Sequence, residues 1–334
     1  MVANVAVGKS WANLATWIVG GLAAWGVVLG SGIDLADMLA SSKLDQARFA
    51  IDAGSIVSGV AAAGFLFRPI RRDVAAFLHI DIDNPVHILA LVLAVILFGT
   101  QVSSLVLTDV LGALGDQQPQ RLADVFYDEL PLLIVAVTGV GLFIRRPVAA
   151  TAERLGIVRP TWWQVVLGLA AAGVFLALLI GFDAANHYLL PDTARRVDTV
   201  NSHLFGELAT TGWLGVAALA LLPGICEELL FRGALQPRIG LVATALLFTS
   251  IHSQYGISLD LAGIFVIALG LGLIRKWTNT TTSVVAHVSY NLLAGISLGG
   301  TALYAAFGLD AVLVAAAALG IWQHMQRTRK ADES

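Results

Sequence analysis

Two adjacent carboxylates and an arginine interrupt a long apolar stretch, in the sequence Pro223-Gly-Ile-Cys-Glu-Glu-Leu-Leu-Phe-Arg232. Glu228 and Arg232 are four residues apart, the spacing and order at which an acidic and a basic side chain meet best along a helix. Glu227 projects about 100 degrees away from Glu228, because an α-helix has 3.6 residues per turn. We therefore expect Arg232 to neutralise Glu228, which leaves Glu227 free to face another group.

Further polar side chains occur at helical spacing in the apolar segments that follow. His252 lies four residues after Phe248 and Asn291 four residues after His287, so the members of each pair lie on one face of a helix. From the expected helix ends and the rise per residue, Glu227, His252, His287 and Asn291 lie about 10 to 16 Å below the cytoplasmic membrane surface. Side chains at a shared depth can form one site.

A carboxylate, two imidazoles and an amide at one depth suit the hydrolysis of a peptide bond. A glutamate can act as a general base that takes a proton from water and hands it to a leaving amine. Histidine can orient that water, donate a proton or bind a metal. An asparagine amide can donate hydrogen bonds to a tetrahedral oxyanion, which contributes about 3 to 4 kcal/mol per donor in known cases.

The elements that must position these residues are membrane helices. The chain has 57% hydrophobic and 13% charged residues and a mean hydropathy of +0.80, whereas a soluble globular protein has about 25% charged residues. We expect an all-α polytopic transmembrane bundle of about eight to ten spans, since each span needs about 20 apolar residues. The candidate spans are residues 11–31, 49–67, 85–107, 130–144, 162–182, 212–231, 241–256, 260–274, 281–298 and 302–322.

The basic residues predict an orientation, because cytoplasmic loops carry the excess of Lys and Arg. With the N-terminus inside, the outer face keeps few of the 20 Lys and Arg residues, namely Lys43, Arg48, Arg121, Arg195 and Arg196. We therefore expect both termini to be cytoplasmic. The high Ala, Gly and Val content is typical of a bacterial protein, which places the chain in a bacterial plasma membrane.

Charge and cysteine content limit the partners. The net charge is -3 and no basic stripe with interleaved aromatics occurs, so nucleic acid is not an expected partner. Membrane lipid is expected, and the basic segment 146–163, with Trp162 and Trp163 at its end, fits an interfacial anchor. Arg154 and Arg159 in this segment could meet anionic lipid.

At these residues the sequence resembles a known family. Glu227-Glu228-x-x-x-Arg232, Phe248-x-x-x-His252 and His287-x-x-x-Asn291 are similar to the three motifs of the CAAX-protease and bacteriocin-processing (CPBP, or Abi) intramembrane endopeptidases, in the same order and on separate predicted helices. The resemblance covers roughly residues 160–300. It implies a helical fold with a polar catalytic cavity open to the cytoplasm, and a peptide or protein substrate that is associated with the membrane.

The resemblance also implies a role for each motif residue. Glu227 would activate water and His252 would help to hold it, while His287 and Asn291 would stabilise the oxyanion. Glu228, Arg232 and Phe248 would support the site. Members of the family are often labelled metalloproteases. Glu227, His252 and His287 are of residue types that bind Zn²⁺ and could hold this ion. An HExxH sequence is absent, so metal dependence stays open.

Two organisational expectations follow. Residues 146–330 would form the protease core, and residues 1–145 would be N-terminal transmembrane helices of unknown role.

Two alternative functions remain. Buried Glu, His and Asn residues also occur in proton-coupled transporters, and a non-proteolytic protein of the same fold, with a scaffold or immunity role, is a further alternative.

Other reactive residues have simpler interpretations. Ser297 lies in a G-x-S-x-G sequence, but this motif needs a strand-to-helix turn, and here it follows an apolar helix. Cys226 is expected to be an inert buried thiol. His187 and His203 lie in a polar segment predicted to be an outer loop, where we expect them to be solvated.

Overall fold

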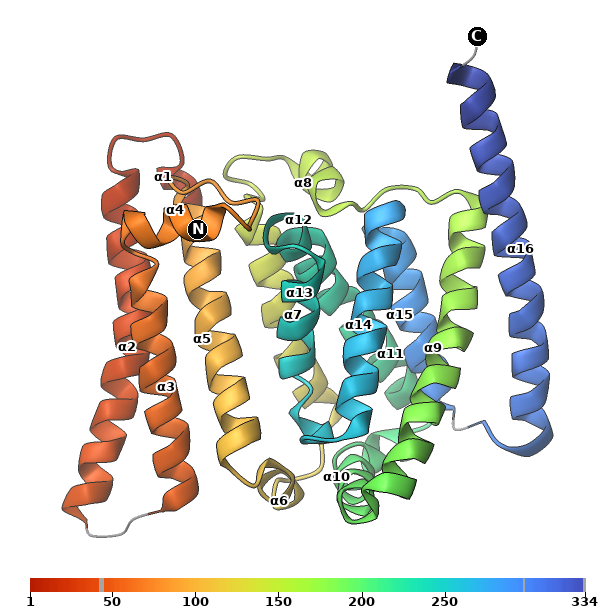
Figure 1. The fold of residues 1–334 in the computed structure, drawn as a ribbon, viewed down its shortest axis with the longest axis horizontal. Coiled ribbons are helices and arrows are strands. Elements are labelled where there is room, and N and C mark those ends of the chain that lie inside the picture. The colour runs from red at the N-terminus through yellow and green to blue at the C-terminus, as the bar shows by residue number, and fades with distance from the viewer. Residues whose placement is uncertain (42–44, 297, 333–334) are drawn as a thin grey trace.

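A computed structural model describes residues 1–41, 45–296 and 298–332, and these residues form helices without any named β-strand (Figure 1). The expectation of an all-α polytopic membrane bundle is confirmed. Five helices are long and apolar enough to cross a membrane, or six if the bent pair of helices near the N-terminus is one span.

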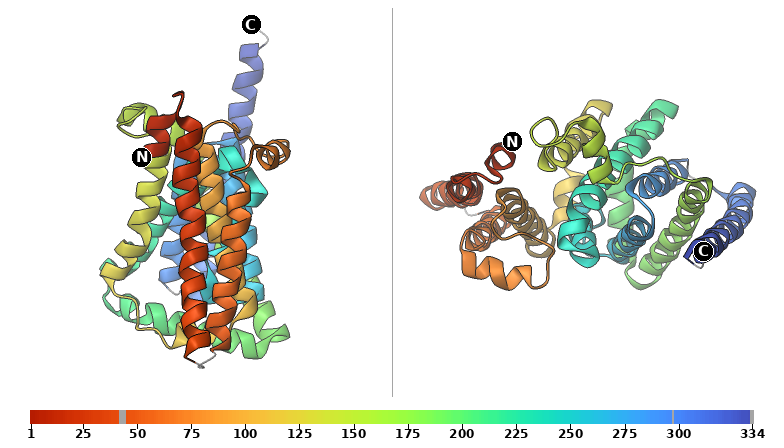
Figure 2. Two further views of the ribbon diagram at one scale, coloured as in Figure 1. Left: turned by 90° about the vertical axis from the view of Figure 1, so that its left-hand side faces the viewer. Right: turned by 90° about the horizontal axis from the view of Figure 1, so that it is seen from above.

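The N-terminal helices form a group at one end of the molecule, and the last helix lies at the other end (Figure 2). Within this group α2, α3 and α5 pack against one another, and α4 is bent by 88° from α3. The bounds are α1 (Val2–Ala6), α2 (Ala12–Ala40), α3 (Gln46–Gly64), α4 (Arg68–Ala75), α5 (Pro85–Leu107) and α6 (Val110–Gly115).

The remaining helices include those that carry the predicted site residues. They are α7 (Leu122–Gly139), α8 (Val148–Leu155), α9 (Trp162–Leu189), α10 (Pro191–Thr210), α11 (Trp213–Glu228), the π-helical η1 (Leu229–Leu235), α12 (Gln236–Ile239), α13 (Leu241–Ser250), the 3₁₀ turn η2 (Ser253–Tyr255), α14 (Leu259–Trp277), α15 (Thr280–Gly295) and α16 (Gly300–Asp332).

The number of full-length apolar helices is smaller than the eight to ten spans expected. The predicted spans at 241–256 and 281–298 correspond to α13 and α15, which have 10 and 16 residues. A helix of 10 residues is about 15 Å long, half the thickness of the hydrocarbon core. α13 buries one face against its neighbours and leaves Val242 and Leu246 exposed, whereas most residues of α15 are buried or half-buried.

The backbone break after α13 is important for the site. The helix ends at Ser250, and His252 lies on non-helical backbone with φ -93° and ψ 51°. Non-helical backbone at membrane depth is tolerated where it is buried in protein or lines a cavity. We therefore expect this break to face the interior of the bundle.

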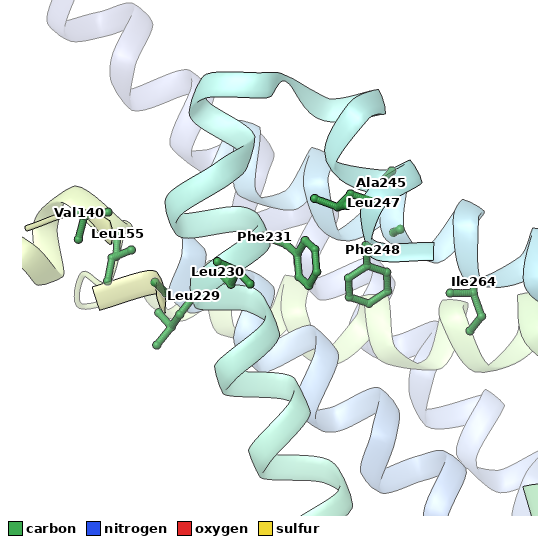
Figure 3. Packing of buried hydrophobic residues seen from close by; sticks show 11 residues of the cluster. Val140, Leu155, Leu229, Leu230, Phe231, Ala245, Leu247, Phe248 and Ile264 are labelled. Carbon is green, nitrogen blue, oxygen red and sulfur yellow. The ribbon is translucent and has the colours of Figure 1, made fainter. Parts of the chain in front are cut away.

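Apolar side chains from α7, α8, η1, α13 and α14 form the largest buried cluster. Phe231 and Phe248 pack edge to face at 5.3 Å between ring centroids, and Leu229, Leu230 and Leu155 extend the cluster towards α8 (Figure 3). Such offset or edge-to-face contacts are favoured by the ring quadrupoles. The cluster fills the bundle between η1 and α8.

Two faces of the molecule can be distinguished. The termini face carries α1, α4, α8, α12 and the end of α16, and the α10 face carries α6 and α10 (Figure 1). Of the five basic residues assigned to the outer side, Arg48, Arg121, Arg195 and Arg196 lie near the α10 face, whereas Lys43 lies outside the described residues. The four described basic residues that the sequence assigned to one side of the membrane therefore lie near one face of the structure.

The segment predicted to be a polar outer loop is mostly helical. α9 continues to Leu189, and α10 begins at Pro191 and ends at Thr210. Proline is well tolerated in the first turn of a helix, because the N–H that it lacks would have no helical partner there. Polar residues here therefore indicate a helix at the membrane surface rather than an irregular loop.

Gly224 allows the two site-bearing helices α11 and α15 to approach closely. A β-carbon at this position would lie 2.6 Å from Val288 Cγ2 and 3.0 Å from the Val288 backbone nitrogen. Small residues permit such backbone approach between membrane helices. The backbone contact cannot be relieved by rotating a side chain.

We therefore expect Gly224→Ala to lower the stability of the protein by roughly 1 to 3 kcal/mol, because overpacking would force α11 and α15 apart. The matched control is Gly181→Ala in α9, where a β-carbon would meet nothing within 4 Å. That change is expected to be neutral or stabilising by up to about 1 kcal/mol, since alanine is the better helix former. Thermal unfolding in detergent measures both. Equal loss of stability in the two variants would contradict the packing argument.

Candidate active site

A cavity of about 630 Å³ lies between α5, α7, α11, α13, α14 and α15. Glu227, His252, His287 and Asn291 all line it. The structure therefore brings together the four side chains that the sequence placed at one depth. Phe248 lines the same cavity, whereas Glu228 and Arg232 lie behind its wall.

The cavity extends to the α10 face. Its lining includes Gln117 and Gln120 between α6 and α7, Phe205 of α10, and the exposed Gly295 at the end of α15. Towards the termini face the bundle is filled by the apolar cluster around Phe231. Figure 1 shows α6 and α10 at the end of the bundle away from the termini.

The lining of the cavity reaches the α10 face, whereas both termini lie at the opposite face. Which of the two faces is cytoplasmic stays a prediction. The expected depths were counted from the cytoplasmic end of each helix, and a depth does not show from which side the site is reached. The apolar cluster that closes the other side is formed by residues from distant parts of the sequence.

Glu227 has a carboxylate oxygen without a protein partner among the described residues. It lies in the last turn of α11 and is 6% exposed, and its Oε2 atom is buried without a hydrogen-bond partner. Buried polar atoms in folded proteins nearly always have a partner, and a water molecule often provides it. An unpartnered carboxylate oxygen in a residue on a cavity wall is therefore a site for a water molecule.

Glu228 is, in contrast, fully enclosed by partners. Its Oε1 atom lies 2.9 Å from Arg232 Nη1 and 3.0 Å from His287 Nδ1. The hydroxyl group of Ser283 donates a hydrogen bond to the other carboxylate oxygen. The expected Glu228–Arg232 pair is present, and the contacts with His287 and Ser283 add a connection to α15 that the helical spacing could not reveal.

Arg232 and Phe248 support the imidazole rings of His252 and His287. The guanidinium of Arg232 lies 4.2 Å from the centroid of the Phe248 ring and donates a hydrogen bond to the Ala268 carbonyl at 3.2 Å. The Phe248 ring also contacts His252 and His287, at centroid distances of 4.6 and 5.9 Å. One aromatic ring thus joins the supporting arginine to both histidines.

The hydrogen bonds of the two histidines orient their rings. His252 Nδ1 lies 2.8 Å from the carbonyl oxygen of Phe248, so this nitrogen must donate. Neutral His252 then keeps an acceptor lone pair on Nε2. His287 Nδ1 donates to the Glu228 carboxylate, so Nε2 carries a hydrogen only when His287 is an imidazolium.

The Asn291 side chain is held by a backbone carbonyl that Pro223 leaves unpaired in α11. Proline has no backbone N–H, so Pro223 cannot donate the helical hydrogen bond to the carbonyl of Leu219. The Asn291 Nδ2 atom lies 3.4 Å from this carbonyl oxygen and donates to it. The second N–H of the amide then remains available, and Asn291 lines the cavity.

The π-helical segment η1 follows directly after the two glutamates. A π-helix pairs residues five apart, and such segments are frequent at functional sites. Here it carries Phe231 and Arg232, which are both fully buried. η1 contributes Phe231 to the lining of the cavity and Arg232 to the ion pair with Glu228.

Two residues of the site were not predicted. Glu129 of α7 lines the same cavity, is 8% exposed, and has a buried Oε2 atom without a partner. Glu129 lies just before the predicted span 130–144, and its signal in the sequence is the acidic pair with Asp128 before Pro131. Ser283 was missed because a serine in an apolar helix is common.

A metal ion needs ligand atoms that converge. Among the described residues, one trio of His, Cys, Asp or Glu has ligand atoms within 4.8 Å of one another, namely Asp183, His187 and Asp198 near the α10 face. Glu227, His252 and His287 as placed do not form such a trio, so they do not fit Zn²⁺ in this arrangement.

The other reactive residues of the sequence are two histidines, one cysteine and one serine. His187 contacts Asp183 and Asp198 at 3.5 and 3.3 Å, and His203 Nε2 lies 2.7 Å from the Gln117 carbonyl, so both have protein partners and lie on helices. Cys226 is a buried free thiol. Ser297 lies outside the described residues. The division of the chain at residue 145 stays a prediction, although α7 contributes to the cavity.

Comparison with known proteins agrees with the site. The family model of type II CAAX prenyl endopeptidase Rce1-like proteins matches residues 209–293, which contain all three motifs. The chain is 30% identical over 161 residues to the uncharacterised protein YpbD of Bacillus subtilis strain 168, a match that covers 47% of this chain and 79% of YpbD. No solved structure gives a significant match. The chain belongs to the Rce1-like family of membrane CAAX-type endopeptidases.

Proposed function

We propose that this protein is a membrane-embedded endopeptidase that hydrolyses a peptide bond with a water molecule activated by Glu227. The observation that carries the proposal is the unpartnered Oε2 atom of Glu227, in a residue that lines one cavity with His252, His287 and Asn291. A carboxylate without a partner can accept a proton from water.

The attacking water would be held by two acceptors. Glu227 accepts one hydrogen, and the free Nε2 lone pair of His252 accepts the other, since Nδ1 donates to the Phe248 carbonyl. As the water oxygen bonds to the carbonyl carbon, its proton moves to Glu227. The peptide bond thereby becomes a tetrahedral intermediate whose former carbonyl oxygen is negatively charged.

Two donors would stabilise that oxyanion. The free N–H of Asn291 is one, since its other N–H is used by the Leu219 carbonyl. His287 as imidazolium supplies Nε2–H, with Nδ1–H held by Glu228. Donors fixed before the reaction stabilise a developing charge better than mobile water, because they need no reorganisation.

The intermediate would collapse when Glu227 returns its proton to the leaving nitrogen. The C–N bond breaks, the amine leaves, and the new carboxyl group is released with it. One water molecule is consumed and Glu227 is regenerated. Glu228 takes no proton in this scheme, because its oxygens are occupied by Arg232, His287 and Ser283.

The substrate would enter from the α10 face. A volume of about 630 Å³ holds a few residues of an extended peptide, and the lining is mainly apolar between its polar groups. The basic termini face fits the cytoplasmic side by the positive-inside rule. The scissile bond would then be reached from the outer side of a bacterial plasma membrane, in a peptide or protein that is associated with that membrane.

Glu227→Gln is expected to abolish peptide cleavage, since the amide cannot accept the proton of water. The variant keeps the size of the side chain, so the thermal stability should stay near that of the wild type. Turnover of a fluorogenic peptide library by protein purified in detergent measures the effect, with the exposed Glu153→Gln as the matched control.

Full turnover by Glu227→Gln would contradict the catalytic role. Proton-coupled uptake into liposomes, without cleavage by the wild type, would favour a transporter. Absence of both activities would favour a scaffold or immunity role.

Pro223→Ala is expected to separate stability from catalysis. The new N–H at position 223 can donate to the Leu219 carbonyl and displaces the Asn291 amide, while the helix gains a better helix former. We expect an unchanged or higher melting temperature and a kcat lower by about 10-fold or more, with little change in KM. A kcat equal to that of the wild type would show that the Leu219 contact does not position Asn291.

Metal chelation is expected to leave cleavage unchanged, because Glu227, His252 and His287 do not converge as ligands. The assay compares turnover before and after incubation with 1,10-phenanthroline and with its non-chelating isomer. Loss of turnover with the chelator alone, followed by recovery with Zn²⁺, would contradict the proposed water activation.

A further inference from the structure

A second cavity, of about 190 Å³, lies at the termini face between α5, α8, the end of α7 and α12. Its charged lining is entirely basic. We refer to it as the arginine pocket and define it by its basic side chain types, which are His87, Arg145, Arg146, Arg154 and Arg238. Among the described residues, no aspartate or glutamate lines it. The catalytic cavity and this pocket share no lining residue.

The arginines of the pocket have few partners. None of the ion pairs found in the described part of the chain involves any of them. Arg154 donates to the Gly233 carbonyl at 3.1 Å and Arg145 to the Asn4 side chain at 2.8 Å, while Arg238 Nε is buried without a partner. A guanidinium has five N–H donors, so most donors of the pocket remain unused.

The arrangement is electrostatically costly without an anion. Burial, and then the charges of Arg238, Arg146 and Arg275, lower the pKa of the Arg154 guanidinium to about 10. Like charges held close together in a partly buried site repel, and the repulsion is screened less than it would be at an open surface. A bound anion would remove both penalties.

His87 is prepared to donate as well. The backbone N–H of Asp81 donates to His87 Nδ1 at 2.9 Å, so Nδ1 must accept and the hydrogen of the neutral ring lies on Nε2. Asp81 is the acidic residue near this ring and is itself exposed. The pocket thus combines one neutral donor with four guanidinium groups.

The deeper wall of the pocket is apolar. Leu91 of α5, Val135 of α7 and Leu230 of η1 line it below the basic side chains. A headgroup with a negative charge and an attached hydrocarbon chain matches this order of basic rim and apolar wall. Basic pockets between membrane helices on the cytoplasmic side are known to hold anionic lipid headgroups.

We propose that the arginine pocket binds a phosphate-bearing anion at the face that carries the termini. Guanidinium groups recognise phosphate well, because their planar N–H pairs can donate two parallel hydrogen bonds. The source of the phosphate is either an anionic phospholipid or the free ion, and the apolar wall favours the lipid.

An anion in the pocket would connect the N-terminal helices to η1 and α12, which follow Glu227 and Glu228 in the chain. The His79 backbone N–H donates to the Arg238 carbonyl at 2.8 Å, which joins the segment before α5 to α12. Arg154 reaches the Gly233 carbonyl within η1. The bound anion would hold α5, α8 and α12 together, and this role does not depend on the proposed peptidase activity.

The test follows the melting temperature of the purified full-length protein in a neutral detergent at constant ionic strength. The additions are phosphatidylglycerol, phosphatidylcholine or inorganic phosphate. Phosphatidylglycerol is expected to raise the melting temperature by several degrees and phosphatidylcholine to leave it unchanged, because a ligand that binds only the folded state stabilises it.

Arg154→Gln and Arg238→Gln are expected to weaken binding by roughly tenfold each, since each removes charged hydrogen bonds to the anion. Arg195→Gln, on the α10 face, is the matched control and should keep the full response. Without added lipid, the two pocket variants should be as stable as the wild type or more stable, because a repelling charge is removed.

The outcomes are distinct. A shift with inorganic phosphate as large as that with phosphatidylglycerol, lost in the pocket variants, would support the site and identify the free ion as ligand. The proposal is overturned if neither compound shifts the wild type, or if Arg195→Gln loses the shift as fully as Arg154→Gln.

Discussion

The buried carboxylate of Glu228 is the constraint on which the rest of the site depends. A charge enclosed in a membrane bundle is stable only if its partners replace the lost hydration. Glu228 meets this requirement with Arg232, His287 and Ser283, and these residues come from η1 and α15. Three elements must therefore pack in one arrangement before the charge is satisfied, and that arrangement also sets the ring of His287 beside the cavity.

The same constraint distinguishes two carboxylates that are neighbours in sequence. Both oxygens of Glu228 have partners, whereas Glu227, one residue earlier, has a buried oxygen with none among the described residues. Their different directions follow from the helical turn, and their different environments follow from what packs there. Phe248 completes the support, because its ring lies against Arg232 on one side and contacts both histidines.

Sequence reasoning reached the parts of the site that depend on local geometry. The Glu228–Arg232 pair and the shared face of His287 and Asn291 follow from helical spacing alone. The Glu228–His287 contact joins residues 59 positions apart, and the Leu219–Asn291 contact joins residues 72 apart, so both require the packed bundle. The short helix α13 and the side on which the cavity opens also depend on packing, because a hydropathy profile reports neither enclosure by neighbouring helices nor which end of a bundle is filled.

The termini face and the α10 face differ in their basic residues. Basic residues collect at the termini face, where the arginine pocket lies, whereas the cavity mouth near α10 carries exposed Asp128 and few basic residues. By the positive-inside rule, we expect the first face to be the cytoplasmic one. A membrane protein can use this asymmetry for two tasks at once, because anionic lipid would be bound on the side that anchors the bundle while the catalytic cavity stays free on the other. The apolar cluster between η1 and α8 separates the two sites physically, and η1 contributes residues to both of their walls.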